Sequence, residues 1–109
     1  MSLRVWIDDV RPAPDGYKWV KSVQDAKKLI RHCAFMKSFF PHKDYWDIEV
    51  LDIDHDAGMY AQFGGDYIKL LDWMERNNLS FPIRIHSMNP VGAANMRAII
   101  ERNGWKEIK

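Results

Sequence analysis

Acidic and histidine side chains crowd together at the end of a short apolar segment in the middle of the chain. Asp52, Asp54, His55 and Asp56 lie within or directly after the apolar residues of segment 48–53. Carboxylates so close in sequence repel one another and resist desolvation, so a fold tolerates them best where a cation or solvent compensates their charge. The alternative is a polar loop whose acids are simply solvated. The size of the cluster favours a functional site.

Two further groups of polar residues end other short apolar segments. Asp8 and Asp9 end the first apolar segment of the chain, and His86 and Ser87 follow the segment 81–85. Ligands of open α/β sheets bind at the carboxyl ends of the strands. Polar groups at the ends of three predicted strands therefore indicate one shared site.

The acids of these groups are candidates for a metal site. We expect Asp8, Asp9, Asp54 and Asp56 to hold Mg²⁺ or Mn²⁺, because such ions take oxygen ligands. Asp54 is also expected to take part in the chemistry, since it lies nearest the rim of the predicted sheet. Asp52 is the alternative key carboxylate, because residues two apart on a strand point to the same side.

The remaining polar residues suit anion binding and proton transfer. Arg11, Ser87 and Asn89 are expected to bind phosphate, the last two beside the first turn of a predicted helix. His55 and His86 are expected to act as catalytic base and acid, because histidine changes its protonation near neutral pH. The alternative for His86 is a hydrogen-bonded structural residue at a strand end. A metal, a phosphate clamp and two proton carriers together indicate phosphoryl chemistry.

Alternating strands and helices must position these groups. Apolar segments bounded by turn residues predict five strands, and helical periodicity with capping residues predicts three helices. The predicted strands are 3–7, 17–20, 48–53, 81–85 and 105–108, and the helices begin after Ser22, at Tyr67 and at Pro90. This order predicts an α/β fold with a mainly parallel five-stranded sheet. Prolines and a glycine interrupt the first connection, so the direction of the second strand stays open.

Length, charge and cysteine content narrow the class of protein. The chain has 109 residues, which predicts a single domain over 1–109. Its net charge of +1 argues against general nucleic-acid binding. The single cysteine, Cys33, lies on the apolar stripe of the first helix and is expected in the core rather than as a nucleophile. Without a signal peptide or a membrane-spanning apolar run, we expect a cytoplasmic protein. The candidate phosphate-binding residues indicate a small phosphorylated substrate.

The strand-end residues resemble those of the receiver domain of response regulators. The matching residues are Asp8 and Asp9, an aspartate that ends the central strand, and Ser87. The resemblance implies that the paired acids bind Mg²⁺, that the central aspartate accepts a phosphoryl group and that the serine senses it. The chain departs from receivers because it lacks their first and last helices and a matching lysine after the last strand.

A closer resemblance is to the cyclic-phosphate processing receiver-like family. The motifs that carry it are WIDDVRP at 6–12, DHD at 54–56 and HSMNPVG at 86–92, followed by Asn95 and Met96. The three motifs stand in the expected order, and the resemblance covers nearly the whole chain apart from a longer connection around residues 37–45. The resemblance implies a receiver-like (flavodoxin-like) fold and a metal-dependent phosphoesterase acting on a cyclic phosphate of nucleotide or RNA-end type.

Three functions from different classes remain. The first is the phosphoesterase, the second is a signalling module phosphorylated on Asp54, and the third is a module that binds a phosphorylated ligand without turnover. His55 and His86 favour the enzyme, because a phosphoacceptor does not need them.

The absence of the first and last receiver helices also predicts a bare sheet face. Bare apolar faces commonly bind partners. We expect a homodimer or a dedicated partner to use residues such as Trp6 and Val50 on that face.

Overall fold

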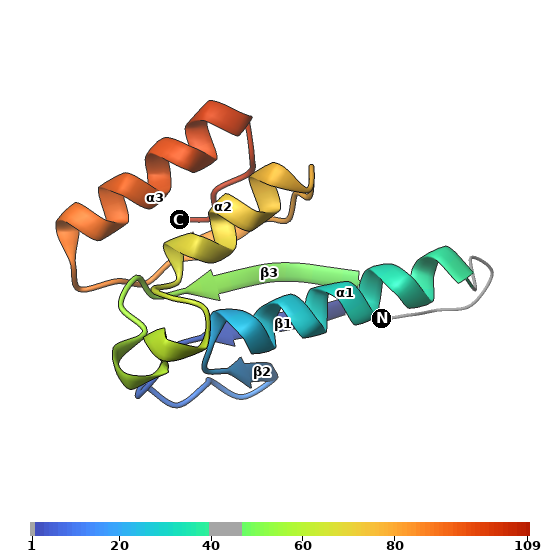
Figure 1. Cartoon of the computed structure of the whole chain (residues 1–109), viewed down its shortest axis with the longest axis horizontal. Coiled ribbons are helices and arrows are strands. Elements are labelled where there is room, and N and C mark those ends of the chain that lie inside the picture. Colours follow the sequence, from blue (N-terminus) through green and yellow to red (C-terminus); the bar gives the residue numbers. More distant parts are fainter. Residues whose placement is uncertain (1, 40–46) are drawn as a thin grey trace.

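In the computed structural model, which describes residues 2–39 and 47–109, four strands form a parallel sheet (Figure 1). Their order across the sheet is β2 (Tyr17–Val20), β1 (Ser2–Ile7), β3 (Asp47–Ile53) and β4 (Ile83–Ile85). The direction of β2, which the sequence leaves open, is parallel to β1. All four strands therefore end at the same edge of the sheet.

Helices follow each of the last three strands in the chain. They are α1 (Val23–Phe39), the short 3₁₀ helix η1 (Gly58–Phe63), α2 (Ile68–Arg76) and α3 (Pro90–Asn103). One core cluster joins apolar residues of α1, α2 and α3 to alternate residues of the central strands, such as Ile7, Leu51 and Ile53. The three α-helices therefore pack on one face of the sheet.

Two helix starts follow the predicted capping chemistry. The Ser22 hydroxyl accepts the backbone N–H of Asp25 at 3.1 Å where α1 begins. The Asn89 side chain accepts the N–H of Gly92 at 3.0 Å, and Pro90 takes the first position of α3.

Cys33 of α1 is half-buried, and burial together with the nearby charge of Asp47 raises the pKa of its thiol, which argues against a nucleophile.

The connection from β1 to β2 packs on the opposite face without a helix. Trp6 alternates along β1 with the core residues Val5 and Ile7, and its indole N–H donates to the carbonyl of Arg11 at 2.9 Å. The crossover through residues 8–16 thus covers the face that the helices leave free, as a right-handed connection requires.

This packing corrects the prediction of an exposed apolar face. Trp6 is only 9% exposed and Val50 only 6%, so neither is available to a second protein. The ion pair between Arg4 and Glu49, at 2.9 Å, adds charge to the same face. The homodimer stays a prediction, but Trp6 and Val50 can no longer be its contact residues.

The predicted fifth strand is not confirmed in the part of the chain that the structure describes. The segment after α3 makes an isolated parallel bridge between Glu107 and Ile83. The Ile83 N–H donates to Lys106 at 2.9 Å, and the Ile108 N–H donates back to Ile83 at 2.8 Å. Since β4 has only three residues, little backbone is available for a longer ladder.

No helix within the described residues is long and apolar enough to cross a membrane.

Candidate functional site

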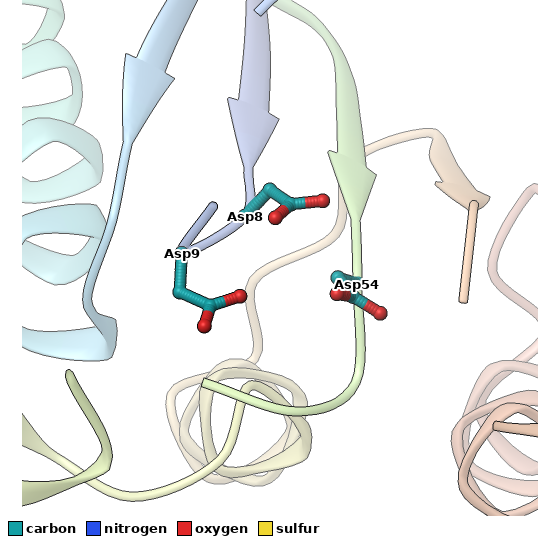
Figure 2. Close-up of side chains that lie close together, drawn as sticks. All are labelled: Asp8, Asp9 and Asp54. Atoms are coloured by element: carbon teal, nitrogen blue, oxygen red, sulfur yellow. The ribbon is translucent and has the colours of Figure 1, made fainter. Parts of the chain in front are cut away.

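Three carboxylates converge where β1 and β3 end (Figure 2). Asp8, Asp9 and Asp54 each offer one oxygen atom, and these atoms lie within 4.8 Å of one another. Asp8 is fully buried, Asp54 is 7% exposed, and Asp9 is partly exposed. We call these three residues the acidic trio.

The pairing of neighbouring strands brings the acidic trio together. Ile7 of β1 pairs with Ile53 of β3, so the aspartates that follow the two strands are neighbours. The N–H of Asp54 donates to the carbonyl of Ile7 at 2.9 Å, which continues the ladder by one bond. Asp9 lies against Gly58, where an added Cβ would come 2.3 Å from the Asp9 carboxylate. Gly58 also has a φ of +55°, so glycine suits this position on both counts.

Arg11 and the loop backbone compensate the charge of the buried acids. The backbone N–H groups of Val10 and Arg11 donate to Asp8 at 3.0 and 2.9 Å. The Arg11 guanidinium contacts Asp8 at 3.1 Å and Asp54 at 3.2 Å. Burial alone would raise the pKa of Asp8, but the two backbone bonds, a hydrogen bond from His86 and the charge of Arg11 together lower it.

His86 lies between two buried carboxylates. Its Nδ1 is 2.6 Å from Asp52, and its Nε2 is 2.9 Å from Asp8. The ring stacks on Trp6 with a centroid distance of 3.8 Å and an interplanar angle of 5°. Its side chain is only 8% exposed, so His86 does not have the solvent-facing position expected of a catalytic acid. Asp52 in turn accepts a hydrogen bond from Arg84 at 3.0 Å.

His55 is placed differently from His86. Its Nδ1 is 2.8 Å from the carboxylate of Asp56, which leaves Nε2 for a further partner. The ring packs against Gly92 in the first turn of α3, where an added Cβ would come 2.4 Å from its Cγ. The other oxygen of Asp56 is 3.5 Å from the side-chain nitrogen of Asn89. The structure thus places Asp56 against His55 and α3 and not in the acidic trio.

The start of α3 contributes fewer anion donors than the sequence suggested. The N–H of Asn89 donates to the hydroxyl of Ser87 at 3.0 Å, and the Asn89 side chain caps Gly92. These contacts use donors that a phosphate would otherwise take. Because the Ser87 oxygen accepts this bond, its hydroxyl hydrogen can donate to a ligand.

The negative charge of the acidic trio affects the pKa of a nearby buried tyrosine. Tyr67 is fully buried, and its hydroxyl donates to the carbonyl of Lys21 at 2.7 Å. Burial raises the pKa of the Tyr67 phenol, and Asp9, Asp8 and Asp54 raise it further. The phenol therefore stays protonated and keeps its hydrogen bond to the Lys21 carbonyl.

The donor set of the acidic trio fits a hard divalent cation. Carboxylate oxygens are the preferred ligands of Mg²⁺ and Mn²⁺, and three of them lie within reach of one ion. The lack of a side chain at Gly58 lets the Asp9 carboxylate lie close to the backbone there, beside the other two acids. Arg11, which contacts two members of the trio, has to make room for an ion or share the carboxylates with it.

Sequence reasoning missed the buried contacts of the site. It predicted that Asp8, Asp9 and Asp54 meet, with Asp52 as the alternative to Asp54 for the key carboxylate. In the structure Asp52 is fully buried beneath His86 and is bonded to Arg84. The opposite charges of Asp52 and Arg84 could have indicated the buried position of Asp52, because the two residues occupy paired positions on the neighbouring strands β3 and β4.

The fold and the site together define a receiver-like α/β domain with strand-end acids. In a comparison with known families, residues 3–102 match the cyclic-phosphate processing receiver domain. The chain therefore belongs to this family, as its motifs suggested. No curated protein and no solved structure matches the chain. The family's name ties the domain to cyclic-phosphate processing.

Proposed function

We propose that the protein is a metal-dependent phosphoesterase that opens a cyclic phosphate of nucleotide or RNA-end type. The observation that carries the proposal is the convergence of Asp8, Asp9 and Asp54 within 4.8 Å at one edge of a parallel sheet. Family membership supports the choice of a cyclic phosphate as substrate. A bound Mg²⁺ or Mn²⁺ would supply Lewis-acid polarisation of the phosphate and of a water molecule.

The residues around the acidic trio have separate roles in this proposal. The trio holds the cation, and Arg11 stabilises the negative charge that develops on the phosphate oxygens. Ser87 donates its hydroxyl hydrogen to the same group, and Asn89 fixes the loop that presents Ser87. The reaction adds water to phosphorus and breaks one ring P–O bond, so one proton leaves the water and one reaches the departing oxygen.

His55 is the residue that we assign to proton transfer. Asp56 contacts Nδ1 at 2.8 Å and orients the ring, so Nε2 carries the exchange with the substrate or water. His86 has both nitrogens against carboxylates, so proton transfer by His86 would require it to give up one of these contacts. We therefore assign His86 to the support of the site.

A screen of purified protein tests the proposal. Cyclic mononucleotides, 2′,3′-cyclic phosphate ends and linear phosphoesters are incubated with Mg²⁺, Mn²⁺ or a chelator, and phosphomonoester formation is measured. We expect turnover of a cyclic phosphate with metal, and loss of this turnover in Asp54→Asn. Turnover that is equal in wild type and Asp54→Asn, or equal with chelator, contradicts the proposal.

The signalling alternative gives a different result in the same experiment. Family membership in the receiver class favours it, together with the position of Asp54 at the end of β3. In that case a small phosphodonor forms an acyl phosphate on wild type and not on Asp54→Asn, while cyclic phosphates remain intact. A protein that does neither, yet binds a phosphate ligand by calorimetry, would be a binding module.

A further inference from the structure

A series of polar contacts runs from the exposed side chain of Arg84 through buried groups to the acidic trio. It begins at Arg84, whose guanidinium contacts Asp52 at 3.0 Å. Asp52 contacts His86 at 2.6 Å, and His86 contacts Asp8 at 2.9 Å. Asp52 and Asp8 are both fully buried. Every step is within hydrogen-bond distance, so the position of each group depends on its neighbour.

The His86 ring is fixed in three directions. Carboxylates hold its two nitrogens from opposite ends, and Trp6 supports its flat face at a centroid distance of 3.8 Å. Trp6 is itself fixed, since its indole N–H donates to the carbonyl of Arg11. A ring held in this way cannot turn without breaking a contact of a buried carboxylate. His86 is therefore suited to hold Asp8 in one orientation.

A contribution to folding stability does not explain why a carboxylate occupies the buried position of Asp52. A buried carboxylate pays a desolvation cost that pairing only partly offsets, and apolar residues of similar size are often as good or better. Arg84 does not need Asp52 as a partner, because its side chain is 47% exposed and water can solvate it. The contact of Asp52 that reaches the site is the one to His86.

We propose that Asp52 is a positioning residue, which acts through the His86 ring to hold the Asp8 carboxylate in the orientation that the acidic trio needs to bind a cation. The inference rests on the proposed metal site. Asp52 itself contacts neither cation nor substrate. Outer residues that orient metal ligands commonly change metal affinity by about 10- to 100-fold when they are replaced.

A double-mutant cycle of metal affinity tests the proposal. The variants are Asp52→Leu, His86→Gln and the double variant, and Mn²⁺ and Mg²⁺ affinities are measured by calorimetry below the melting temperature of each. We expect each single variant to weaken binding about 10-fold or more. We expect the double variant to bind no more weakly than His86→Gln, because Asp52 acts through His86.

Two further variants separate positioning from general loss of structure. Glu49→Gln removes an ion-paired carboxylate from the same strand, opposite Arg4, and is expected to leave metal affinity unchanged. Asp52→Asn keeps an oxygen that can accept from His86, so it is expected to bind metal more tightly than Asp52→Leu and serves if the leucine variant does not fold. Unchanged metal affinity in a folded Asp52→Leu variant overturns the proposal, and so do additive effects of the two single substitutions.

Metal-free crystal structures of wild type and Asp52→Leu test the positioning independently of metal binding. We expect His86 to leave its place on Trp6 and the Asp8 carboxylate to change its orientation in Asp52→Leu, which removes the contact to His86 Nδ1. If wild type binds no metal, the proposed function fails, and these structures still test the positioning. An Asp8 side chain that stays in place without the Asp52 carboxylate overturns the inference.

Discussion

His55 and His86 both follow a strand, yet their different contacts indicate different roles. His55 has one nitrogen against Asp56 and its ring against α3, whereas both nitrogens of His86 face buried carboxylates. Sequence alone cannot separate the two, because the partners of His86 come from β1 and β3, far away in the chain. The residue types at the site were therefore predictable, but the division of roles depends on tertiary packing.

Replacing His55 tests its assignment to proton transfer. We expect His55→Ala to lower kcat by about 10²- to 10⁴-fold, the usual cost of losing a general acid or base. His32→Ala is the matched control, because His32 is an exposed residue of α1, and it should leave kcat unchanged. A wild-type kcat in folded His55→Ala would contradict the role.

The contact between His55 and Gly92 gives a second test at this scale. In an ordinary helix, alanine is more favourable than glycine by about 1 kcal/mol. At Gly92 a Cβ would come 2.4 Å from the His55 ring, so we expect Gly92→Ala to give no such gain and to lower kcat by displacing the ring. Asn95→Ala, at an exposed position of α3, should be neutral or slightly stabilising and leave kcat unchanged. Thermal unfolding and steady-state kinetics measure both effects; a stabilised, fully active Gly92→Ala would contradict the packing.

At the scale of elements, α2 and α3 are joined by a polar contact that depends on pH. Arg102 contacts the Glu75 carboxylate at 2.9 Å, and Asn103 also donates to it. The hydrogen bonds from Asn103 and Arg102 lower the pKa of Glu75 below its ordinary value. A lowered carboxyl pKa adds stability that is complete above the ordinary pKa and disappears as the pH falls through the lower one.

We therefore expect Glu75→Gln to lower the melting temperature at pH 7. The difference from wild type should shrink as the pH falls below about 4.5, the ordinary pKa of a glutamate carboxyl. Melting curves between pH 7 and pH 3 measure it. Glu101→Gln, at an exposed position of α3, provides the control. A difference that stays constant over this pH range would show that the Glu75 charge has no part in the contact.

The order of elements was largely predictable, and the failures have physical reasons. Caps such as Ser22 and Asn89 act through neighbouring backbone groups, so the sequence predicts where α1 and α3 begin. The parallel direction of β2 was not predictable, because its connection to β1 has no helix and packs through Trp6. The fifth strand is not confirmed beyond an isolated bridge, because backbone pairing also depends on the length of the neighbouring strand, and β4 is short.

At the scale of the whole molecule, the two edges of the sheet differ. The segment after α3 covers β4 through the backbone of Ile83, and Trp105 packs against the core. β2 forms the other edge, and Lys18 is exposed there, a feature that discourages edge-to-edge pairing.

Removing residues 105–109 should therefore weaken the fold and expose an edge. We expect the free energy of unfolding to fall by about 2 kcal/mol or more, from the lost tryptophan contacts and backbone bonds. We also expect concentration-dependent association by light scattering, since the backbone of β4 becomes accessible. Removal of Lys109 alone is the control. An unchanged urea midpoint and a monomeric truncated protein would contradict this role of the segment.

The most direct measurement of the central claim is a ³¹P NMR time course of the protein with a 2′,3′-cyclic nucleotide and Mg²⁺. The account predicts that the cyclic phosphate signal is replaced by that of a phosphomonoester. Chelator and Asp9→Asn should each stop this conversion, because the acidic trio is needed for the metal. A cyclic phosphate that persists with folded wild-type protein and metal, in a sample whose Asp54 becomes phosphorylated by a small phosphodonor, would contradict the account and establish a signalling receiver in its place.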